Sequence, residues 1–381
     1  MTKESIFTNA RIVTAESEFD GTVVVRCGHI VEVAPGRSDA PGVLDLEGDY
    51  LVPGLVELHT DNMEKHFAPR PGVKWPSLPA VMAHDTQIAA AGITTVFDSL
   101  ALGDVRGDTD RVLNRERMIE AVRTVSDRRM ARAEHRIHLR CEIVADDAVE
   151  ALERWIDLPQ VGLVSINDHT PGQRQFLDPE KLRHYHTKKY GMTNAEFDVF
   201  SARAIELHHK NAARHRNEIV AHAQARALPL ASHDDATRAH VEEAVENGMT
   251  IAEFPTTLEA AQASCEAGLA VLVGAPNLVL GGSHSGNIAA IDLLRDGRAD
   301  ILSSDYVPAS LMEGLFKLSA SGVGISLPQA VRLASLNPAR AVGLCDRGEI
   351  APERRADMVR VRLLDGAPAV RAVWREGERV V

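Results

Sequence analysis

Residues 51–66 read LVPGLVELHTDNMEKH, and the stretch changes character near its middle. Residues 51–56 are almost entirely apolar, which is typical of a short buried strand. The residues that follow carry histidine, acid, amide and lysine side chains instead. His59 and Asp61 lie two residues apart, so an extended backbone directs both side chains to the same face. The stretch therefore predicts a buried strand that ends in a polar loop with a chemical function.

Comparable strands recur through the middle of the chain, separated by helical segments. Seven more are GITTVFDSL, RIHLRCEIV, VGLVSINDH, LPLASHDD, MTIAEFP, LAVLVGAPN and ADILSSDY, and the strand before His59 makes eight. Eight strands that alternate with helices predict a (β/α)8 barrel of the TIM type, which is an α/β fold. Such barrels carry their active site at the C-terminal ends of the strands. The ends of the predicted strands are therefore the places to look for chemistry.

The two ends of the chain show a different pattern. Residues 1–50 and 350–381 hold short runs in which apolar and polar residues alternate, with turns between the runs. This pattern is typical of a small β-meander. We expect the two ends to meet in one discontinuous β-sandwich domain beside a metal-dependent barrel formed by residues 51–349.

Composition argues against several classes of function. The 381 residues carry a formal net charge of −12, which disfavours nucleic acid as a partner because nucleic-acid binding usually needs a basic face. The longest apolar stretches have the length of strands, and the N-terminal MTKESIFTNA lacks a signal-peptide core. We therefore expect a cytoplasmic protein with no membrane partner. Four cysteines lie far apart without a CxxC pair, which favours ordinary thiols over disulfides or a zinc knuckle. A homodimer is expected only because two-fold dimers are the commonest oligomers.

Side chains that bind metals gather where the predicted strands end. They are His59, Asp61, Glu142, Asn167, Asp168, His169, His233, Asp234, Asp235 and Asp305. Imidazole and carboxylate groups are the donors that bind Zn²⁺, Mn²⁺ or Fe²⁺ in proteins. Any one of them alone would suit a core histidine or a helix-capping aspartate. Because five strands end in this way, one shared metal site is the better interpretation.

The longest motifs resemble a known family. They are PGLVELHTDNMEKHFAPRPGVKWP, FDSL, HLRCE, NDHTPGQRQ, ASHDDAT, GAPNLVLGGSHSGN and SSDY. Over essentially the whole chain they resemble the amidohydrolase superfamily and, within it, the PhnM family of the carbon–phosphorus lyase pathway. The resemblance implies a diphosphatase, a hydrolase that acts on phosphoanhydride bonds. Its implied substrate is a polyphosphorylated sugar phosphonate, alpha-D-ribose 1-methylphosphonate 5-triphosphate, which is cleaved to the 5-phosphate and pyrophosphate.

The resemblance also implies two divalent metal ions, zinc in the first place and manganese or iron as alternatives. The implied metal ligands are His59, Asp61, Glu142, His169, His233 and Asp305. In this scheme Glu142 bridges the two metals and Asp305 is also the catalytic base. The sequence departs from the commoner pattern at the sixth strand, where Glu253 stands in place of a histidine. Either His169 or Glu253 could complete the second metal site.

A triphosphate also needs cationic side chains and N–H donors. One predicted group, after the first strand and in the long insertion, is Lys65, His66, Arg70, Arg174 and Lys188. A second, in the glycine-rich segment 281–287, is Gly282, Ser283, His284 and Ser285. That segment precedes the predicted helix NIAAIDLLRDG, and a helix start at this place in a barrel suits a phosphate. The insertion at 169–195 has a length typical of an active-site lid.

Two other interpretations stay open. A cyclic-amide hydrolase or a deaminase on the same scaffold would act on a neutral ring, because fold alone does not fix the reaction. A neutral ring would not need the phosphate-binding segments. A non-catalytic subunit of a phosphonate-processing complex, in contrast, would need neither a metal nor Asp305.

Overall fold

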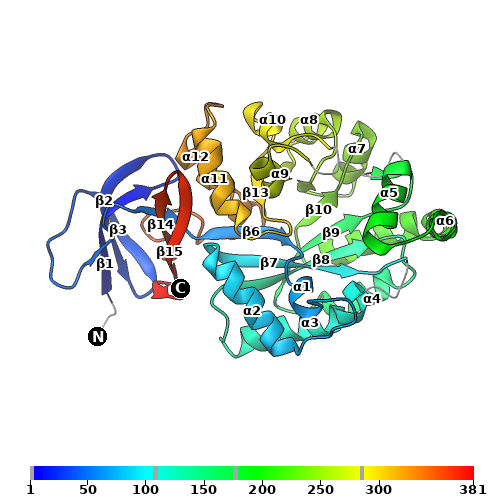
Figure 1. Ribbon diagram of the computed structural model, residues 1–381, viewed down its shortest axis with the longest axis horizontal. Coiled ribbons are helices and arrows are strands. Elements are labelled where there is room, and N and C mark those ends of the chain that lie inside the picture. Colours follow the sequence, from blue (N-terminus) through cyan, green and yellow to red (C-terminus); the bar gives the residue numbers. More distant parts are fainter. Residues whose placement is uncertain (1–3, 106–109, 175–178, 284–286) are drawn as a thin grey trace.

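The computed structural model describes residues 4–105, 110–174, 179–283 and 287–381. It contains two sheets, which Figure 1 shows side by side: a parallel barrel surrounded by helices, and a mostly antiparallel sheet near both ends of the chain. The chain passes from the second sheet into the barrel and returns to it at the C-terminal end.

The barrel comprises eight parallel strands within the described residues, and their spatial order follows the order of the chain. They are β6 (Leu55–Thr60), β7 (Ile93–Leu102), β8 (Glu134–Glu142), β9 (Val161–Asn167), β10 (Leu230–His233), β11 (Ile251–Glu253), β12 (Ala270–Gly274) and β13 (Ile301–Ser303). The predicted (β/α)8 barrel is therefore confirmed. Because the strands are parallel, their C-terminal ends meet on one face, which we call the mouth of the barrel.

Polar contacts close the ring between the first and last barrel strands. Thr60 and Asp305 form a parallel bridge, and the Thr60 hydroxyl donates to the Asp305 carbonyl oxygen at 2.6 Å. The buried Glu57 carboxylate accepts hydrogen bonds from Ser303 Oγ at 2.8 Å and from the Ser304 backbone N–H at 2.6 Å. Burial raises the pKa of Glu57 to about 7, although these donors act in the opposite direction. Glu57 thereby holds β6 to the end of β13, close to the predicted site residues His59 and Asp305.

The inside of the barrel is filled with apolar side chains. One buried cluster draws on seven of the strands: Val56, Leu58, Phe97, Leu163, Ala231, Ile251, Leu272 and Ile301. The helices are α1 (Glu64–Phe67), α2 (Ser77–Ala90), α3 (Asp110–Asp127), α4 (Ala148–Trp155), α5 (Pro179–Tyr190), α6 (Asn194–Gln224), α7 (Arg238–Glu246), α8 (Leu258–Glu266), α9 (Ala275–Leu280), α10 (Ala290–Arg295), α11 (Ser310–Ala320), α12 (Leu327–Arg332) and α13 (Leu336–Ala341). Within the described part of the chain, none of these helices is both long and apolar enough to cross a membrane.

The second sheet, which we call the terminal sheet, is built from both ends of the chain. Its strands are β1 (Glu4–Val13), β2 (Glu18–Arg26), β3 (His29–Pro35), β4 (Leu44–Asp45), β5 (Tyr50–Pro53), β14 (Met358–Leu364), β15 (Ala367–Arg375) and β16 (Glu378–Arg379). Their order is β16-β15-β14-β5-β1-β2-β3, with β4 beside β1. The prediction that the two ends of the chain meet in one β-structure is confirmed.

The single strand predicted over residues 51–56 is wrong, because the run is divided between the two sheets. β5 pairs with β1 and β14 in the terminal sheet, whereas β6 pairs with β7 in the barrel. Gly54 lies between them, and a Cβ at this position would come within 2.3 Å of the Thr94 hydroxyl oxygen. Glycine fits this close approach because it lacks a Cβ.

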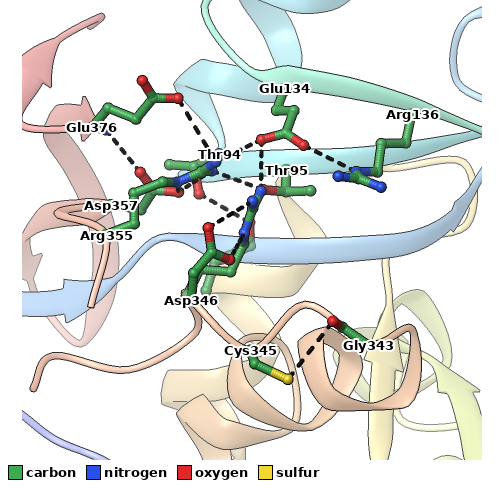
Figure 2. A network of polar contacts seen from close by, with 12 residues as sticks. Thr94, Thr95, Glu134, Arg136, Gly343, Cys345, Asp346, Arg355, Asp357 and Glu376 are labelled. Carbon is green, nitrogen blue, oxygen red and sulfur yellow. Dashed lines mark hydrogen bonds and ion pairs between the residues drawn. The ribbon is translucent and has the colours of Figure 1, made fainter. Parts of the chain in front are cut away.

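A network of ion pairs joins the terminal sheet to the end of the barrel opposite the mouth (Figure 2). Glu134, the first residue of β8, accepts hydrogen bonds from Arg347 Nη1 and Arg355 Nη1, both at 2.6 Å. Arg355 Nε also donates to Asp357 at 2.9 Å, one residue before β14. Burial would raise the pKa of Glu134, but the two arginines outweigh it and lower this pKa to about 2. The network therefore ties the two sheets together through charge.

The segment after β12 differs from its prediction. β12 ends at Gly274 and α9 follows directly, so the residues APNLVL are helical and do not continue the strand. The helix predicted from residue 287 begins at Ala290 as α10 and has six residues. The glycine-rich segment therefore does not lead directly into a long helix.

Candidate metal centre

Two histidines and a glutamate, all buried, meet at the mouth of the barrel: His59 of β6, His233 of β10 and Glu253 of β11. The Glu253 carboxylate lies between the imidazoles, with Oε1 at 3.1 Å from His59 Nδ1 and Oε2 at 3.2 Å from His233 Nδ1. The two rings are stacked, with centroids 5.3 Å apart. A carboxylate on one ring nitrogen orients a histidine so that its other nitrogen can bind a metal. Glu253 is placed to do this for both rings.

A second group lies beside the first and includes His169, Asp234 and Glu142. His169 Nδ1 bonds to Glu142 Oε2, and the His169 backbone N–H donates to Glu142 Oε1 at 3.1 Å. Asp234 Oδ2 lies 3.4 Å from His233 Nε2 and 4.0 Å from His169 Nε2. Donor atoms of His169, His233 and Asp234 all lie within 4.8 Å of one another, so one cation could contact all three.

Asp61 and Asp305 add carboxylates where the barrel closes. The Asp61 backbone N–H donates to the Asp305 carbonyl oxygen at 3.2 Å. Asp305 and Asp234 both have a left-handed backbone, with φ of 54° and 58°, which aspartate tolerates better than most residues. Burial and the charge of Asp61 raise the pKa of Asp305 to about 7, and burial raises the pKa of Asp234 to about 7. Three carboxylates are thus brought together at the mouth of the barrel.

The histidines of this region differ in the direction in which their surroundings shift the pKa. Burial lowers the pKa of His233 well below its usual range, and it lowers the pKa of His138 to about 3. Burial also acts to lower the pKa of His169, but the charge and hydrogen bond of Glu142 outweigh it and raise this pKa. His233 is consequently neutral, which is the form of imidazole that binds a metal.

The residues present fit a divalent cation. The charges of Asp61 and Asp234 both act to raise the pKa of Asp305, and a cation between these carboxylates would remove that cost. Neutral imidazole nitrogen and carboxylate oxygen together suit Zn²⁺, Mn²⁺ or Fe²⁺. All six predicted metal ligands stand at the ends of barrel strands on this face: His59, Asp61, Glu142, His169, His233 and Asp305.

Strand β8 contributes polar residues that the sequence analysis did not single out. In the strict alternation R-I-H-L-R-C-E, residues Ile137, Leu139 and Cys141 belong to a core cluster made with the surrounding helices. The alternate residues His138 and Arg140 therefore share the inward face with Glu142. His138 bonds to Ser165 Oγ at 2.8 Å, and Arg140 Nη2 lies 3.3 Å from His233 Nε2. This two-residue period was the signal in the sequence that could have identified them.

The loop after β6 is anchored by a buried polar chain. The Asn62 side-chain amide lies 2.9 Å from His84 Nδ1, and His84 Nε2 lies 2.7 Å from Asp98 Oδ1. Asp98 Oδ2 lies 2.7 Å from His135 Nδ1. Burial lowers the pKa of His135, but the charges and hydrogen bonds of Asp98 and Asp85 outweigh it and raise this pKa to about 9. Asn62, unassigned by sequence reasoning, thus fixes the loop that carries Asp61.

The predicted substrate-binding residues are spread more widely. Lys65 and Arg70 are exposed, and His66 is half-buried with its Nε2 at 3.0 Å from Gln87 Oε1. Partial burial lowers the pKa of Lys65, and the nearby charge of Asp61 acts in the opposite direction but is the smaller effect. Lys65 and His66 lie in the short helix α1 that follows β6, and Arg70 lies just after it.

The other predicted substrate-binding residues belong to later segments. Arg174 is buried and bonds to Asp235 and, at 2.9 Å, to Glu243, so protein carboxylates already balance its charge. Lys188 is exposed on α5. Gly282 and Ser283 follow α9 and are half-buried. His284 and Ser285 lie outside the described residues.

The mouth of the barrel brings together histidine and carboxylate groups that could hold a metal ion. The family model described as "Amidohydrolase family" matches residues 50–380, and the chain belongs to this family. The chain is 46% identical over 376 residues to the alpha-D-ribose 1-methylphosphonate 5-triphosphate diphosphatase of Escherichia coli (strain K12). That alignment covers 98% of this chain and 100% of the relative.

Solved structures support the fold. An N-acetyl-D-glucosamine-6-phosphate deacetylase from Mycobacterium smegmatis matches with a TM-score of 0.62 and 18% identity, covering 100% of both chains. A 5-methylcytosine deaminase from Klebsiella pneumoniae matches with a TM-score of 0.64 and 14% identity, covering 99% of this chain and 98% of that one. At these identities the likeness concerns the fold only.

Proposed function

We propose that this protein is a metal-dependent diphosphatase that hydrolyses alpha-D-ribose 1-methylphosphonate 5-triphosphate to the 5-phosphate and pyrophosphate. The observation that carries the proposal is 46% identity to a diphosphatase of that name over essentially the full length of both chains. The mouth of the barrel supports it, because it concentrates neutral histidine and buried carboxylate in one place.

Two divalent cations, with zinc as the first candidate, would be held by the six predicted ligands. His59 and Asp61 would hold one ion and His169 and His233 the other, and Glu142 would be shared by both. Glu253 orients His59 and His233 through their Nδ1 atoms, a role that leaves it outside the set of ligands. When bound, the cations neutralise the phosphoryl oxygens and make the attacking water more acidic.

Asp305 is the proposed general base. Asp305 stands where the barrel closes, bridged to Thr60 and next to Asp61, so its carboxylate is placed to accept a proton from water at the centre. Water adds to phosphorus while Asp305 takes its proton. The bridging P–O bond then breaks, and pyrophosphate leaves with the electron pair. Asp305 returns the proton to the products.

The loop after β6 and the segment after α9 supply the proposed phosphate contacts. Lys65 in the short helix α1 and Arg70 after it are exposed cations, and Gly282 and Ser283 lie on the segment after α9. Cations and N–H donors of this kind bind the oxygens of a polyphosphate. A neutral ring would make no use of them.

The test is metal analysis of the purified protein together with pyrophosphate release from the ribose triphosphate, with and without a chelator. We expect bound divalent metal, and release that the chelator abolishes and added metal restores. The matched pair of variants is Asp305→Asn and Asp365→Asn, because both positions have a left-handed backbone that asparagine also tolerates. Asp365 is exposed in the turn between β14 and β15, so its variant should keep full turnover. Bound metal without pyrophosphate release, combined with hydrolysis of a cyclic amide, would overturn the proposal.

A further inference from the structure

Arg140 is a buried cation at the mouth of the barrel to which nothing so far assigns a role. It is 8% exposed and shares the inward face of β8 with His138 and Glu142. Glu142 ends the strand two residues later, so Arg140 lies directly behind the mouth.

Its hydrogen bonding sets Arg140 apart from the other buried arginines. Among the residues described, the buried arginines are Arg140, Arg174, Arg347 and Arg355. Arg174 pairs with Asp235 and Glu243, Arg347 with Glu134 and Asp346, and Arg355 with Glu134 and Asp357. Each of these three guanidinium groups therefore has at least two carboxylate partners, and Arg355 has a third in Glu376.

Arg140 has no carboxylate partner among the described residues. Its Nη2 lies 3.3 Å from His233 Nε2, a neutral ring nitrogen, and its Nε is buried without a hydrogen-bond partner. A metal ion on His233 Nε2 would take even that acceptor from the guanidinium. Arginine remains charged at any physiological pH, so Arg140 cannot escape the cost of burial by losing its proton.

The charge of Arg140 reaches the catalytic groups without forming an ion pair with them. It acts to lower the pKa values of Asp234 and Asp305, although burial dominates both. It also lowers the pKa of His233 and thereby favours the neutral ring. The distance of 3.3 Å from Arg140 Nη2 to His233 Nε2 places the guanidinium beside an atom that would hold metal.

We propose that the Arg140 guanidinium binds an oxygen of the phosphoryl group held at the metal centre, so that the substrate supplies its missing anion. This inference rests on the proposed function for the choice of a polyphosphate ligand. The planar guanidinium suits a tetrahedral phosphoryl group, with the unpaired Nε–H as one donor. The positive charge faces the oxygens on which negative charge concentrates as the anhydride bond breaks.

The experiment measures pyrophosphate binding by calorimetry to the metal-loaded protein, with metal content determined on the same samples. Arg140→Met removes the charge and the donors, whereas Arg140→Lys keeps the charge but loses the planar fork. The control is Arg136→Met, on the same strand and face but at the opposite end of the barrel, where Arg136 bonds to Glu134. We expect Arg140→Met to weaken binding on the order of 10- to 100-fold, as for the loss of charged hydrogen bonds. Arg140→Lys should lose less, and Arg136→Met should bind as the wild type does.

Equal pyrophosphate affinity in Arg140→Met and wild type, at equal metal content, overturns the inference. So does a loss of affinity that disappears once the metal content of the variant is restored, because Arg140 would then act only by positioning His233. If the wild type releases no pyrophosphate from the ribose triphosphate but Arg140→Met still binds pyrophosphate less tightly, the proposed function fails and the role of Arg140 stands.

Discussion

Replacing Glu134 with glutamine should lower the unfolding free energy, because it weakens the junction between the barrel and the terminal sheet. In the folded protein, burial would raise the pKa of Glu134, but Arg347 and Arg355 lower it from 4.5 to about 2. Each pKa unit corresponds to about 1.4 kcal/mol, so the ionised carboxylate contributes about 3 kcal/mol to folding at neutral pH. The Glu134 side chain is 26% exposed, so solvent screens the pairs only in part.

The direction in which the unfolding free energy changes with pH follows from the lowered pKa of Glu134. Between pH 4.5 and 2 the unfolded chain binds a proton at Glu134 that the folded protein does not bind. The stabilisation is therefore fully present above pH 4.5 and is lost as the pH falls towards 2. The Glu134→Gln protein carries no such proton. Its deficit in unfolding free energy should shrink from about 3 kcal/mol at pH 7 towards zero near pH 2.

Urea unfolding at pH 7, 5, 4 and 3, followed by tryptophan fluorescence, measures this deficit. Trp155 of α4 reports on the barrel and Trp374 of β15 reports on the terminal sheet. The control is Glu4→Gln, which removes a carboxylate paired with Arg26 where both side chains are exposed, and it should change stability far less. A deficit that stays the same from pH 7 to pH 3 would refute the reasoning, because the carboxylate would then act through its shape and not through its charge.

Asp305→Asn should lower pyrophosphate release by about 10²- to 10⁴-fold, as expected for loss of a general base, and unchanged turnover would remove that role. Glu253→Gln should weaken metal affinity by about 10- to 100-fold, because His59 and His233 lose their orienting carboxylate. Competition with a coloured chelator measures the affinity, and a variant that binds metal as the wild type does would argue against the orienting role. Arg174→Met should lower the unfolding free energy by about 3–5 kcal/mol, because it leaves the buried Asp235 without its partner; a fully stable variant with a raised KM would instead indicate direct substrate binding. Asp98→Asn should lower thermal stability, because the chain from Asn62 to His135 loses its central charge; an unchanged midpoint in a thermal melt would contradict this.

Local sequence patterns were enough to predict much of the fold. The apolar runs located the eight barrel strands, although the first run merged β6 with β5, and their alternation with helices predicted the parallel order. The boundary at Gly54 was not predictable in this way. Residues 51–53 and 55–56 are equally apolar, and only the different neighbours of the two strands, β14 and β7, assign them to different sheets.

The candidate site, like the fold, was predicted only in part from the sequence. Strand ends identified the donors of the metal centre, because the C-terminal ends of parallel strands must meet. The partners of each donor depend on contacts between distant residues. Glu253 lies 194 residues from His59, and Arg174 lies 61 residues from the Asp235 that balances its charge.

The sequence by itself determined the barrel, the terminal sheet and the kinds of side chain at the mouth, because two-residue and helical periods are local properties of the chain. Only the tertiary structure decided which cationic side chains are already paired with protein carboxylates and which are not. Arg174 looked available in the sequence and is buried in ion pairs, whereas Arg140 was overlooked and has no carboxylate partner among the described residues. The physical reason is that the free energy of a charge depends on its burial and on its neighbours in space, which the order of residues does not specify.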